Sequence, residues 1–130
     1  GDAKTHYEAG VKAAMQMLSQ LYPNAAVISD TQVADYLAAK PYDAAKGWEM
    51  ISEQYWAATL LNEYESFSNW RRTGYPTLIP TNDPGNVTGG TIPRRLIYPT
   101  GEESTNADNF AAAIARQGPN DFTTKVWWDK

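Results

Sequence analysis

The chain has 130 residues, a formal net charge of −4, no cysteine and a single histidine, His6. This length suffices for one domain, and the composition excludes disulfides and thiolate sites and argues against a multi-histidine site or a Ser-His-Asp triad, so we expect no metal ion and no cofactor. The negative charge argues against binding of nucleic acid, which requires clustered cations, and no apolar run approaches the roughly 20 residues of a membrane-spanning helix.

Two helices are predicted at the start of the chain. The first spans about 5–22, because Thr5 and Glu8 have the spacing of a capping box and apolar residues then recur every three or four positions. The second spans about 31–39 and stops at Pro41, whose ring does not continue a helix.

Two further helices are predicted at about 43–62 and 64–73. Large apolar residues of the first lie on two sides, with Trp48 and Trp56 on different stripes. This is typical of a helix packed between two neighbours in a stacked array. Gly74 is the expected C-terminal cap of the second helix. We expect the five tryptophans to lie in the core.

A long irregular segment is predicted over 74–105. Residues 74–101 hold five of the eight prolines and five of the nine glycines, which is too proline-rich for a central strand. A last helix is predicted at about 106–117 and stops at Gly118-Pro119. The tail residues Val126-Trp127-Trp128 would be costly to leave in water, so we expect them to dock on the helices.

The pattern as a whole predicts an all-α fold. Tyr7-Glu8-Ala9 and Tyr42-Asp43-Ala44 are offset by 35 residues, close to the roughly 34-residue period of tetratricopeptide helix pairs. We therefore predict a single domain, residues 1–130, built as a tetratricopeptide-like helical array with a long irregular Pro/Gly-rich segment.

The residues give little support to catalysis. Carboxylates such as Glu49 and Glu53 could form the pair of a glycosidase, but acids on helices are mostly solvated and no motif accompanies them. Exposed aromatic rings stack on sugars, so Tyr75 and Tyr98 in the irregular segment are candidate ligand-binding residues. Composition and spacing alone indicate a mostly helical domain and leave its function open.

Every arginine follows position 70, and four of the five form two pairs, Arg71-Arg72 and Arg94-Arg95. Arginine suits planar, bidentate contacts with carboxylates and carbonyls, so paired arginines in loops indicate fixed geometry. A solvated basic patch is the alternative. Acids in the same half of the chain, such as Glu103, favour internal pairing.

Three spaced motifs follow one another in the second half of the chain. They are Trp70-Arg71-Arg72-Thr73-Gly74-Tyr75-Pro76, then Ile92-Pro93-Arg94-Arg95-Leu96-Ile97-Tyr98-Pro99 with Glu103 and Asn106 after it, and Lys125-Val126-Trp127-Trp128-Asp129-Lys130. This order resembles the C-terminal portion of the SusD/RagB family of outer-membrane nutrient-binding lipoproteins. Upstream, Glu49-x-Ile51-x-x-Gln54-x-Trp56 is similar to the family's helix before the first motif.

The resemblance implies a predominantly α-helical fold in which tetratricopeptide-like helix pairs support irregular loops. It implies a lipoprotein that is anchored through an N-terminal cysteine on the surface of the outer membrane, above a TonB-dependent transporter of the SusC type. It further implies a non-catalytic component that binds oligosaccharides, polysaccharides or other nutrients for uptake. A helical-repeat interaction module that docks to a transporter or scaffold without contacting sugar is the alternative.

The resemblance also implies that the sequence is several-fold shorter than a family member. It places the anchoring cysteine, the first helix pairs and most glycan-contacting aromatics in an N-terminal part outside this chain, so we expect the fragment alone to bind glycans weakly or not at all. The matching motifs are expected to be architectural. The two arginine pairs would tie the irregular segment to the helices through carboxylates and backbone carbonyls, with Glu103 as a partner.

Overall fold

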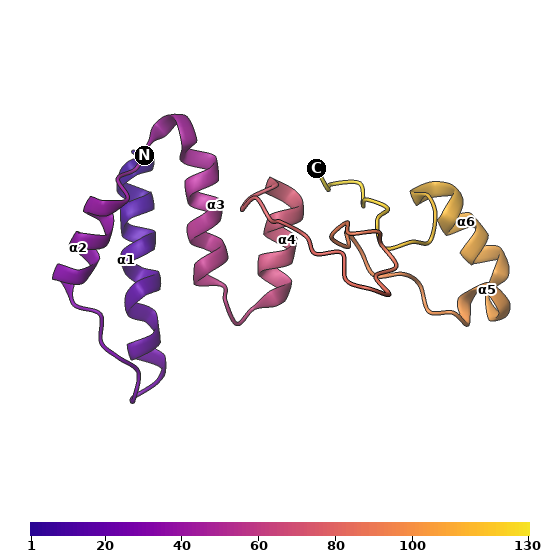
Figure 1. Ribbon diagram of the computed structural model, residues 1–130, viewed down its shortest axis with the longest axis horizontal. Coiled ribbons are helices and arrows are strands. Elements are labelled where there is room, and N and C mark those ends of the chain that lie inside the picture. The colour runs from indigo at the N-terminus through magenta and orange to yellow at the C-terminus, as the bar shows by residue number, and fades with distance from the viewer. The chain divides into compact units, whose positions relative to one another are not determined.

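The computed structural model describes residues 1–130 and contains helices, turns and loops but no strand (Figure 1). Its helices are α1 Ala3–Leu21, α2 Asp30–Ala39, the short 3-10 helix η1 Ala44–Lys46, α3 Gly47–Ala58, α4 Glu63–Thr73, α5 Glu102–Thr105 and α6 Ala107–Gln117. The predicted all-α helical array is therefore confirmed.

Contacts divide the chain into two compact units, unit 1 from Gly1 to Trp70 and unit 2 from Arg71 to Lys130. Unit 1 holds α1, α2, α3 and most of α4. Unit 2 holds the end of α4, the irregular segment, α5, α6 and the tail. That residues 1–130 form a single domain stays a prediction, and the two units are described separately.

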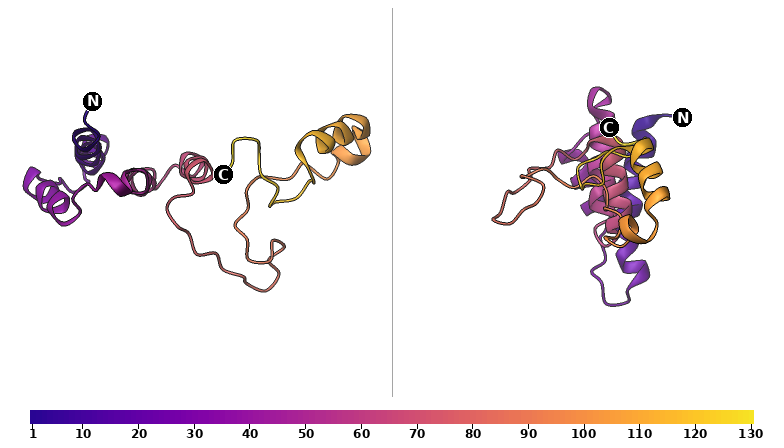
Figure 2. Two further views of the ribbon diagram at one scale, coloured as in Figure 1. Left: turned by 90° about the horizontal axis from the view of Figure 1, so that it is seen from above. Right: turned by 90° about the vertical axis from the view of Figure 1, so that its right-hand side faces the viewer.

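Unit 1 is organised around α1, which lies between α2 and α3 and packs against both (Figure 1). The apolar stripe predicted on α1 supplies the buried side chains Tyr7 and Val11, and α2 contributes Val33. The Tyr7 ring also contacts that of Tyr42, with 5.3 Å between the ring centroids. Figure 2 shows α1 end-on among its neighbours. Periodic burial of one helix face therefore builds this unit.

Helix α1 begins earlier than predicted, because Asp2 caps it. The Asp2 carboxylate accepts hydrogen bonds from the backbone N–H of Thr5 at 3.1 Å and from its hydroxyl at 2.6 Å. Glu8, the expected partner of Thr5 in a capping box, instead forms an ion pair with Lys4 at 2.9 Å. The capping box predicted at Thr5 was wrong, since the aspartate three residues earlier takes both of its donors.

The helix predicted over 43–62 is shorter in the structure. The 3-10 turn η1 precedes it, and α3 ends at Ala58. Just beyond this end the Thr59 hydroxyl donates to Tyr55 O at 2.8 Å and lies 2.7 Å from the Ser66 hydroxyl. Such side-chain bonds to backbone carbonyls compete with continuation of the helix, so the chain turns into α4 here.

Unit 2 contains a one-turn helix, α5, inside the segment 74–105 that was predicted to be irregular. The carbonyl of Gly101 accepts hydrogen bonds from the hydroxyls of Ser104 and Thr105, at 3.0 and 2.7 Å. These local bonds close a helical turn. The proline and glycine content, from which the segment was predicted to be irregular, does not indicate this turn. Helix α5 packs against α6, and the remainder of the segment, 74–101, holds no helix and no strand.

Glycines follow two helices in the left-handed conformation that favours them. Gly74 comes after α4 with φ of +79°, and Gly118 comes after α6 with φ of +92°. Both glycines were predicted to end their helices, and both predictions are confirmed.

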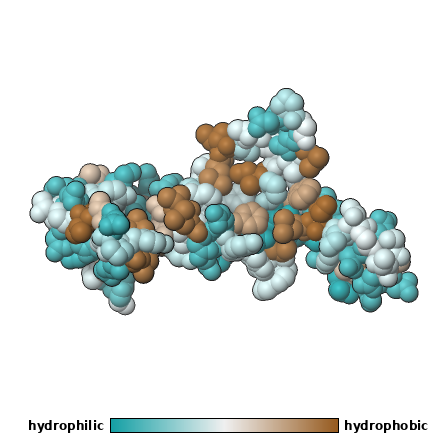
Figure 3. All heavy atoms as spheres, turned by 90° about the horizontal axis from the view of Figure 1, so that it is seen from below, coloured by the Kyte–Doolittle hydropathy of each residue, from teal (hydrophilic) through white to brown (hydrophobic).

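The five tryptophans do not share one core. Trp70 is buried and Trp56 and Trp128 are half-buried, but Trp48 and Trp127 expose 49% and 96% of their surface. The core placement of the last two was wrong, because apolar spacing shows which residues could be covered and not whether another element covers them. Figure 3 shows apolar side chains, drawn in brown, that reach the surface.

Candidate functional site

Arg71 joins the end of α4 to two other parts of unit 2. Its guanidinium lies 4.5 Å from the centroid of the Trp128 ring, a cation–π contact, and its Nη1 donates a hydrogen bond to Arg94 O at 2.8 Å. The carbonyl of Arg71 accepts from the N–H of Lys130 at 3.1 Å. Burial lowers the pKa of this guanidinium, which nevertheless stays protonated near neutral pH. One side chain thus holds both the irregular segment and the tail.

Arg94 forms the ion pair of this region with Asp129. Its Nε donates to Asp129 Oδ2 at 2.8 Å, and its Nη2 donates to Asp129 Oδ1 and, at 3.0 Å, to Lys130 O. The Asp129 side chain is fully buried and that of Arg94 is 12% exposed. Burial and the positive charge of Arg71 lower the pKa of Arg94. This two-point geometry fixes the tail in orientation as well as position.

Arg95 is the most enclosed of the arginines, with 8% of its surface exposed. Its Nε donates to Leu96 O at 3.1 Å, and its guanidinium lies 5.2 Å from the centroid of the Tyr98 ring. Nη1 of this side chain has no hydrogen-bond partner. The backbone N–H groups of Arg94 and Arg95 both point to Phe122 O, at 2.6 and 3.3 Å. The two arginines therefore lie where the irregular segment meets the last residues of the chain.

Tyr98, one of the two candidate ligand-binding residues, is half-buried and has polar partners. Its ring packs edge-on against Phe110 of α6 at 6.0 Å between centroids, and its hydroxyl accepts from Gln117 Nε2 at 2.6 Å. Its N–H donates to Asn120 Oδ1 at 2.8 Å. Through these contacts Tyr98 anchors the irregular segment to α6, and part of the residue stays exposed.

Five side chains form the arginine–tail cluster: Arg71, Arg94, Arg95, Trp128 and Asp129. They bring residues far apart in sequence together through one carboxylate, backbone carbonyls and aromatic rings. The carboxylate is that of Asp129 and not of Glu103, which is exposed and has no ion pair. The Glu103 prediction was wrong because Glu103 lies in α5 and is exposed to solvent.

The remaining motif residues have different surroundings. Arg72 is exposed, and the Tyr75–Pro76 peptide bond is cis. Pro93 directly precedes Arg94, and Asn106 Nδ2 donates to Glu102 Oε2 at 3.0 Å where α5 meets α6.

Tyr75, the other candidate ligand-binding residue, is half-buried. Its N–H donates to the Thr73 hydroxyl at 3.1 Å, and its carbonyl accepts from that hydroxyl at 3.2 Å. Trp127 exposes nearly its whole indole ring, whereas its neighbour Trp128 lies against Arg71. Trp127 is therefore the more available aromatic surface, and the sequence reasoning placed it in the core.

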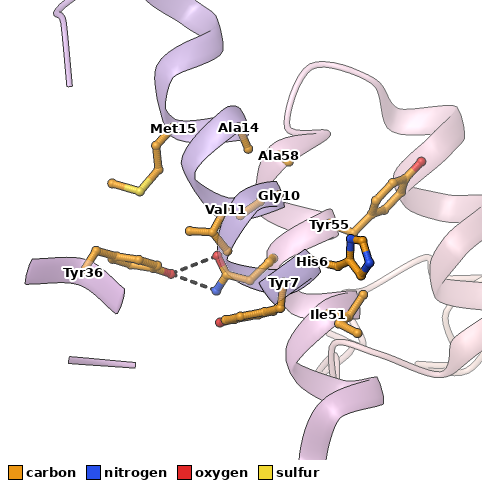
Figure 4. A pocket seen from close by; sticks show the side chains of 12 residues that line it. His6, Tyr7, Gly10, Val11, Ala14, Met15, Tyr36, Ile51, Tyr55 and Ala58 are labelled. Carbon is orange, nitrogen blue, oxygen red and sulfur yellow. Dashed lines mark hydrogen bonds between the residues drawn. The ribbon is translucent and has the colours of Figure 1, made fainter. Parts of the chain in front are cut away.

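Unit 1 contains a cavity of about 400 Å³ that the sequence did not indicate. It lies among α1, α2 and α3, and we call it the helical groove (Figure 4). Its lining residues are His6, Tyr7, Gly10, Val11, Ala14, Met15, Tyr36, Ile51, Gln54, Tyr55, Ala57 and Ala58. The small residues Gly10 and Ala14, four positions apart on α1, leave the space. The spacing of these two small residues is the feature of the sequence from which the cavity could have been predicted.

The helical groove is mainly apolar, and its central polar groups satisfy each other. Tyr36 Oη donates to Gln54 Oε1 at 3.1 Å, and Gln54 Nε2 lies 2.8 Å from the same hydroxyl (Figure 4). Burial raises the pKa of Tyr7, and the nearby Tyr36, Glu53 and Glu8 raise it further. The groove is thus an apolar depression whose Tyr36–Gln54 pair is internally hydrogen-bonded.

No group of three or more histidine, aspartate or glutamate side chains is arranged to hold a metal ion. No helix is both long and apolar enough to cross a bilayer.

Comparison with known proteins identifies relatives of the chain. Residues 1–99 match the model of a SusD-like family described as starch-binding and associating with the outer membrane. A solved chitin-binding protein is 43% identical with a TM-score of 0.89, and the match covers 99% of this chain and 28% of that one. A Bacteroidetes SusD-like protein is 33% identical with a TM-score of 0.87, and the match covers 100% of this chain and 26% of that one.

A chitin-binding SusD homologue from Flavobacterium johnsoniae is 28% identical with a TM-score of 0.76. That match covers 100% of this chain and 32% of the homologue. No curated protein matches the sequence. The chain thus spans between a quarter and a third of the length of these solved structures.

Proposed function

Because the chain belongs to the SusD-like family, described as starch-binding and associating with the outer membrane, we propose that it forms part of a glycan-binding, non-catalytic component of an outer-membrane uptake system. The observation that carries the proposal is 43% identity over 99% of the chain to a solved chitin-binding protein. Two of the three solved relatives described above are named for chitin binding. Chitin oligosaccharides are therefore the proposed ligand class, with starch as the competing one.

Within this function the chain acts mainly as a support. The arginine–tail cluster holds the irregular segment at Arg94 and the tail at Asp129, so side chains displayed near these two points keep a set geometry. Tyr75, Tyr98 and the exposed Trp127 are the proposed sugar contacts from this chain, since aromatic rings stack on the apolar faces of pyranoses. Trp127 is the first to test, because its ring is open and its neighbour Trp128 is held in place by Arg71.

The test is a chimera in which this chain replaces the matching 28% of the chitin-binding relative. The chimera is expected to be retarded in a native gel that contains a soluble chitin derivative, and not in one that contains starch. Trp127→Ala is expected to reduce the retardation, with Trp48→Ala as the matched control because Trp48 is also exposed but lies in unit 1. Retardation counts for this chain only through its loss in Trp127→Ala, because the remaining 72% of the chimera comes from a protein named for chitin binding. Retardation that Trp127→Ala leaves unchanged, or a folded chimera that migrates normally in both gels, would contradict glycan contact by this chain and favour the helical-repeat interaction module.

The non-catalytic role and the membrane partner have their own measurements. Incubation of the chimera with chitin oligosaccharides is expected to release no reducing sugar, and sustained release would overturn the non-catalytic assignment.

For the protein in its cell, we propose a lipid anchor, surface exposure on the outer membrane and a TonB-dependent transporter of the SusC type as partner. Co-purification of such a transporter from detergent-solubilised membranes would support this pairing, and its absence from a purification that retains the lipoprotein would count against it.

A further inference from the structure

Arg95 is a buried cation whose charge no carboxylate of this chain balances. Only 8% of the residue is exposed, and it forms no ion pair. Its Nε donates to Leu96 O at 3.1 Å, whereas its Nη1 is buried and donates to no acceptor. A buried charge without a counter-ion and a buried donor without an acceptor both cost free energy. An anion bound at this guanidinium would remove both costs.

The two carboxylates of the last ten residues, 121–130, bind other groups. Asp129 pairs with Arg94 through both of its oxygens. Asp121 Oδ1 accepts from the N–H groups of Thr123 and Thr124 at 2.8 and 2.6 Å, and from their hydroxyls at 3.0 and 2.9 Å. Neither carboxylate is therefore left to balance the buried guanidinium.

The surroundings of Arg95 add hydrogen-bond donors. Its guanidinium lies 5.2 Å from the centroid of the Tyr98 ring. The Tyr98 hydroxyl accepts from Gln117 Nε2 at 2.6 Å, which leaves its own hydrogen to donate. Asn120 Oδ1 accepts from the Tyr98 N–H at 2.8 Å, which leaves the amide Nδ2 of Asn120 to donate. Three neighbouring side chains thus have donors to offer.

This group of donors lies near the surface of unit 2. Leu96, next to Arg95 in the chain, exposes 82% of its surface, and Tyr98 and Asn120 are half-buried. A planar guanidinium binds two oxygens of a carboxylate or phosphate group in parallel. A neutral sugar hydroxyl would accept from one donor but would leave the charge unbalanced. The chemistry therefore favours an oxyanion over a neutral ligand.

We infer that Arg95, with Tyr98 and Asn120 beside it, forms a binding site for an oxyanion, either a free one such as inorganic phosphate or the carboxylate of an acidic sugar. The site goes beyond the proposed function, because chitin and starch carry no negative charge. Its tests contain neither polysaccharide, so this inference and the glycan proposal fail or succeed separately.

The first experiment compares thermal melts of the 130-residue chain in phosphate and in chloride at equal ionic strength. A ligand that binds only the folded state raises the melting temperature with its concentration. Phosphate also stabilises proteins through exclusion from their surface, so the difference between variants is the measured quantity. The native chain is expected to gain more from phosphate than Arg95→Met, which keeps a long side chain but lacks the charge.

The matched control is Arg116→Met, which removes an exposed arginine of α6 and is expected to keep the native response to phosphate. A purely structural role for Arg95 predicts instead that Arg95→Met melts lower by the same amount in both salts. Equal responses of the native chain and Arg95→Met would overturn the site. Circular dichroism establishes that each variant is folded.

A second variant, Arg95→Lys, keeps the positive charge and removes the planar pair of donors. Titration calorimetry is expected to show phosphate binding about ten-fold more weakly to this variant than to the native chain, because lysine offers a point charge in place of a fork. Native affinity in Arg95→Lys would overturn recognition through the guanidinium. This variant carries the test if Arg95→Met does not fold.

Titrations with acetate and glucuronate distinguish the two sources of the oxyanion. Binding of glucuronate about ten-fold more tightly than acetate would assign the site to an acidic sugar, and equal affinities would assign it to a free anion. Failure of phosphate, acetate and glucuronate alike to bind would overturn the site.

The chimera with the chitin-binding relative shows whether the site remains open in a chain of family length. Its melting temperature is expected to respond to phosphate as that of the 130-residue chain does. Loss of the response in the chimera alone would overturn the ligand site, since a carboxylate of the longer polypeptide would then balance Arg95.

Discussion

The two units of this protein are stabilised in different ways. Unit 1 is built from helices whose apolar stripes meet, so its core residues, such as Val11 and Val33, recur at regular intervals along the sequence. Unit 2 has a long segment without regular structure, and side chains such as Arg94 and Asp129, 35 residues apart, hold it together. Periodic packing distributes stability over many similar contacts, whereas unit 2 concentrates it in a few polar ones.

The largest expected effect comes from removing the buried carboxylate of unit 2. Asp129→Ala leaves the Arg94 guanidinium without its ion-pair partner in a buried place, at a cost of about 3–5 kcal/mol in the free energy of unfolding. Hydrogen exchange is expected to show loss of protection in unit 2 and retention in α1 and α3. Glu103→Ala is the control and should change neither measurement. Protection lost equally in both units would show that they do not differ as described.

The corresponding change in unit 1 is Val11→Ala on α1. Val11 is 4% exposed, so the loss of its buried methyl groups is expected to cost about 1–2 kcal/mol in the free energy of unfolding. Chemical denaturation measures this cost, with Leu21→Ala as the control because Leu21 is 61% exposed on the same helix. The distributed packing of unit 1 would be contradicted if Val11→Ala were as damaging as Asp129→Ala.

The adjacent tryptophans of the tail allow a matched comparison within unit 2. Trp128→Ala removes the ring under Arg71 and is expected to lower the free energy of unfolding by about 1–2 kcal/mol. Trp127→Ala is expected to leave it nearly unchanged, because its ring is 96% exposed. Thermal melts of the two variants check the difference. Equal destabilisation would mean that Trp127 is covered in solution.

The smallest expected effect is a change in how the stability of the protein depends on pH. The pKa of Asp121 is lowered from its ordinary 3.8, first by the Thr124 hydroxyl and then by the Thr124 N–H. A depressed carboxyl pKa contributes stability that is present above about pH 3.8 and is lost as the pH falls through the lower folded-state value. Asp121→Asn is expected to lose less stability than the native chain between about pH 5 and pH 2.5. Thermal melts over this range check it, and identical slopes would contradict the role of Asp121.

The sequence predicted the elements that depend on periodic packing better than those that depend on single polar contacts. Apolar spacing and helix stop signals predicted all five longer helices, including those at 64–73 and 106–117, and the glycines that follow the last two. The start of α1 and the end of α3 were wrong because single side chains, Asp2 and Thr59, decide them through hydrogen bonds. Periodicity carries no information about such bonds.

The candidate site was harder to predict. The arginine motifs identified the right residues for attention, but their partners lie far along the chain, and no local pattern distinguishes Asp129 from Glu103 as the carboxylate. The helical groove depends on what the small residues Gly10 and Ala14 leave unfilled. A cavity is space that side chains leave unfilled, so the sequence indicates it only through the small residues that line it.

The hydrogen bond from Arg71 Nη1 to Arg94 O, at 2.8 Å, has a consequence for how this protein can vary. It joins a residue before the stretch from Gly74 to Thr91 to a residue after it, so this stretch is a loop whose two ends are held together. Lengthening a loop whose ends are already fixed costs little, with each doubling adding only about 0.6 kcal/mol. Insertions and substitutions can therefore accumulate in this loop while the hydrogen bond at its ends remains the same.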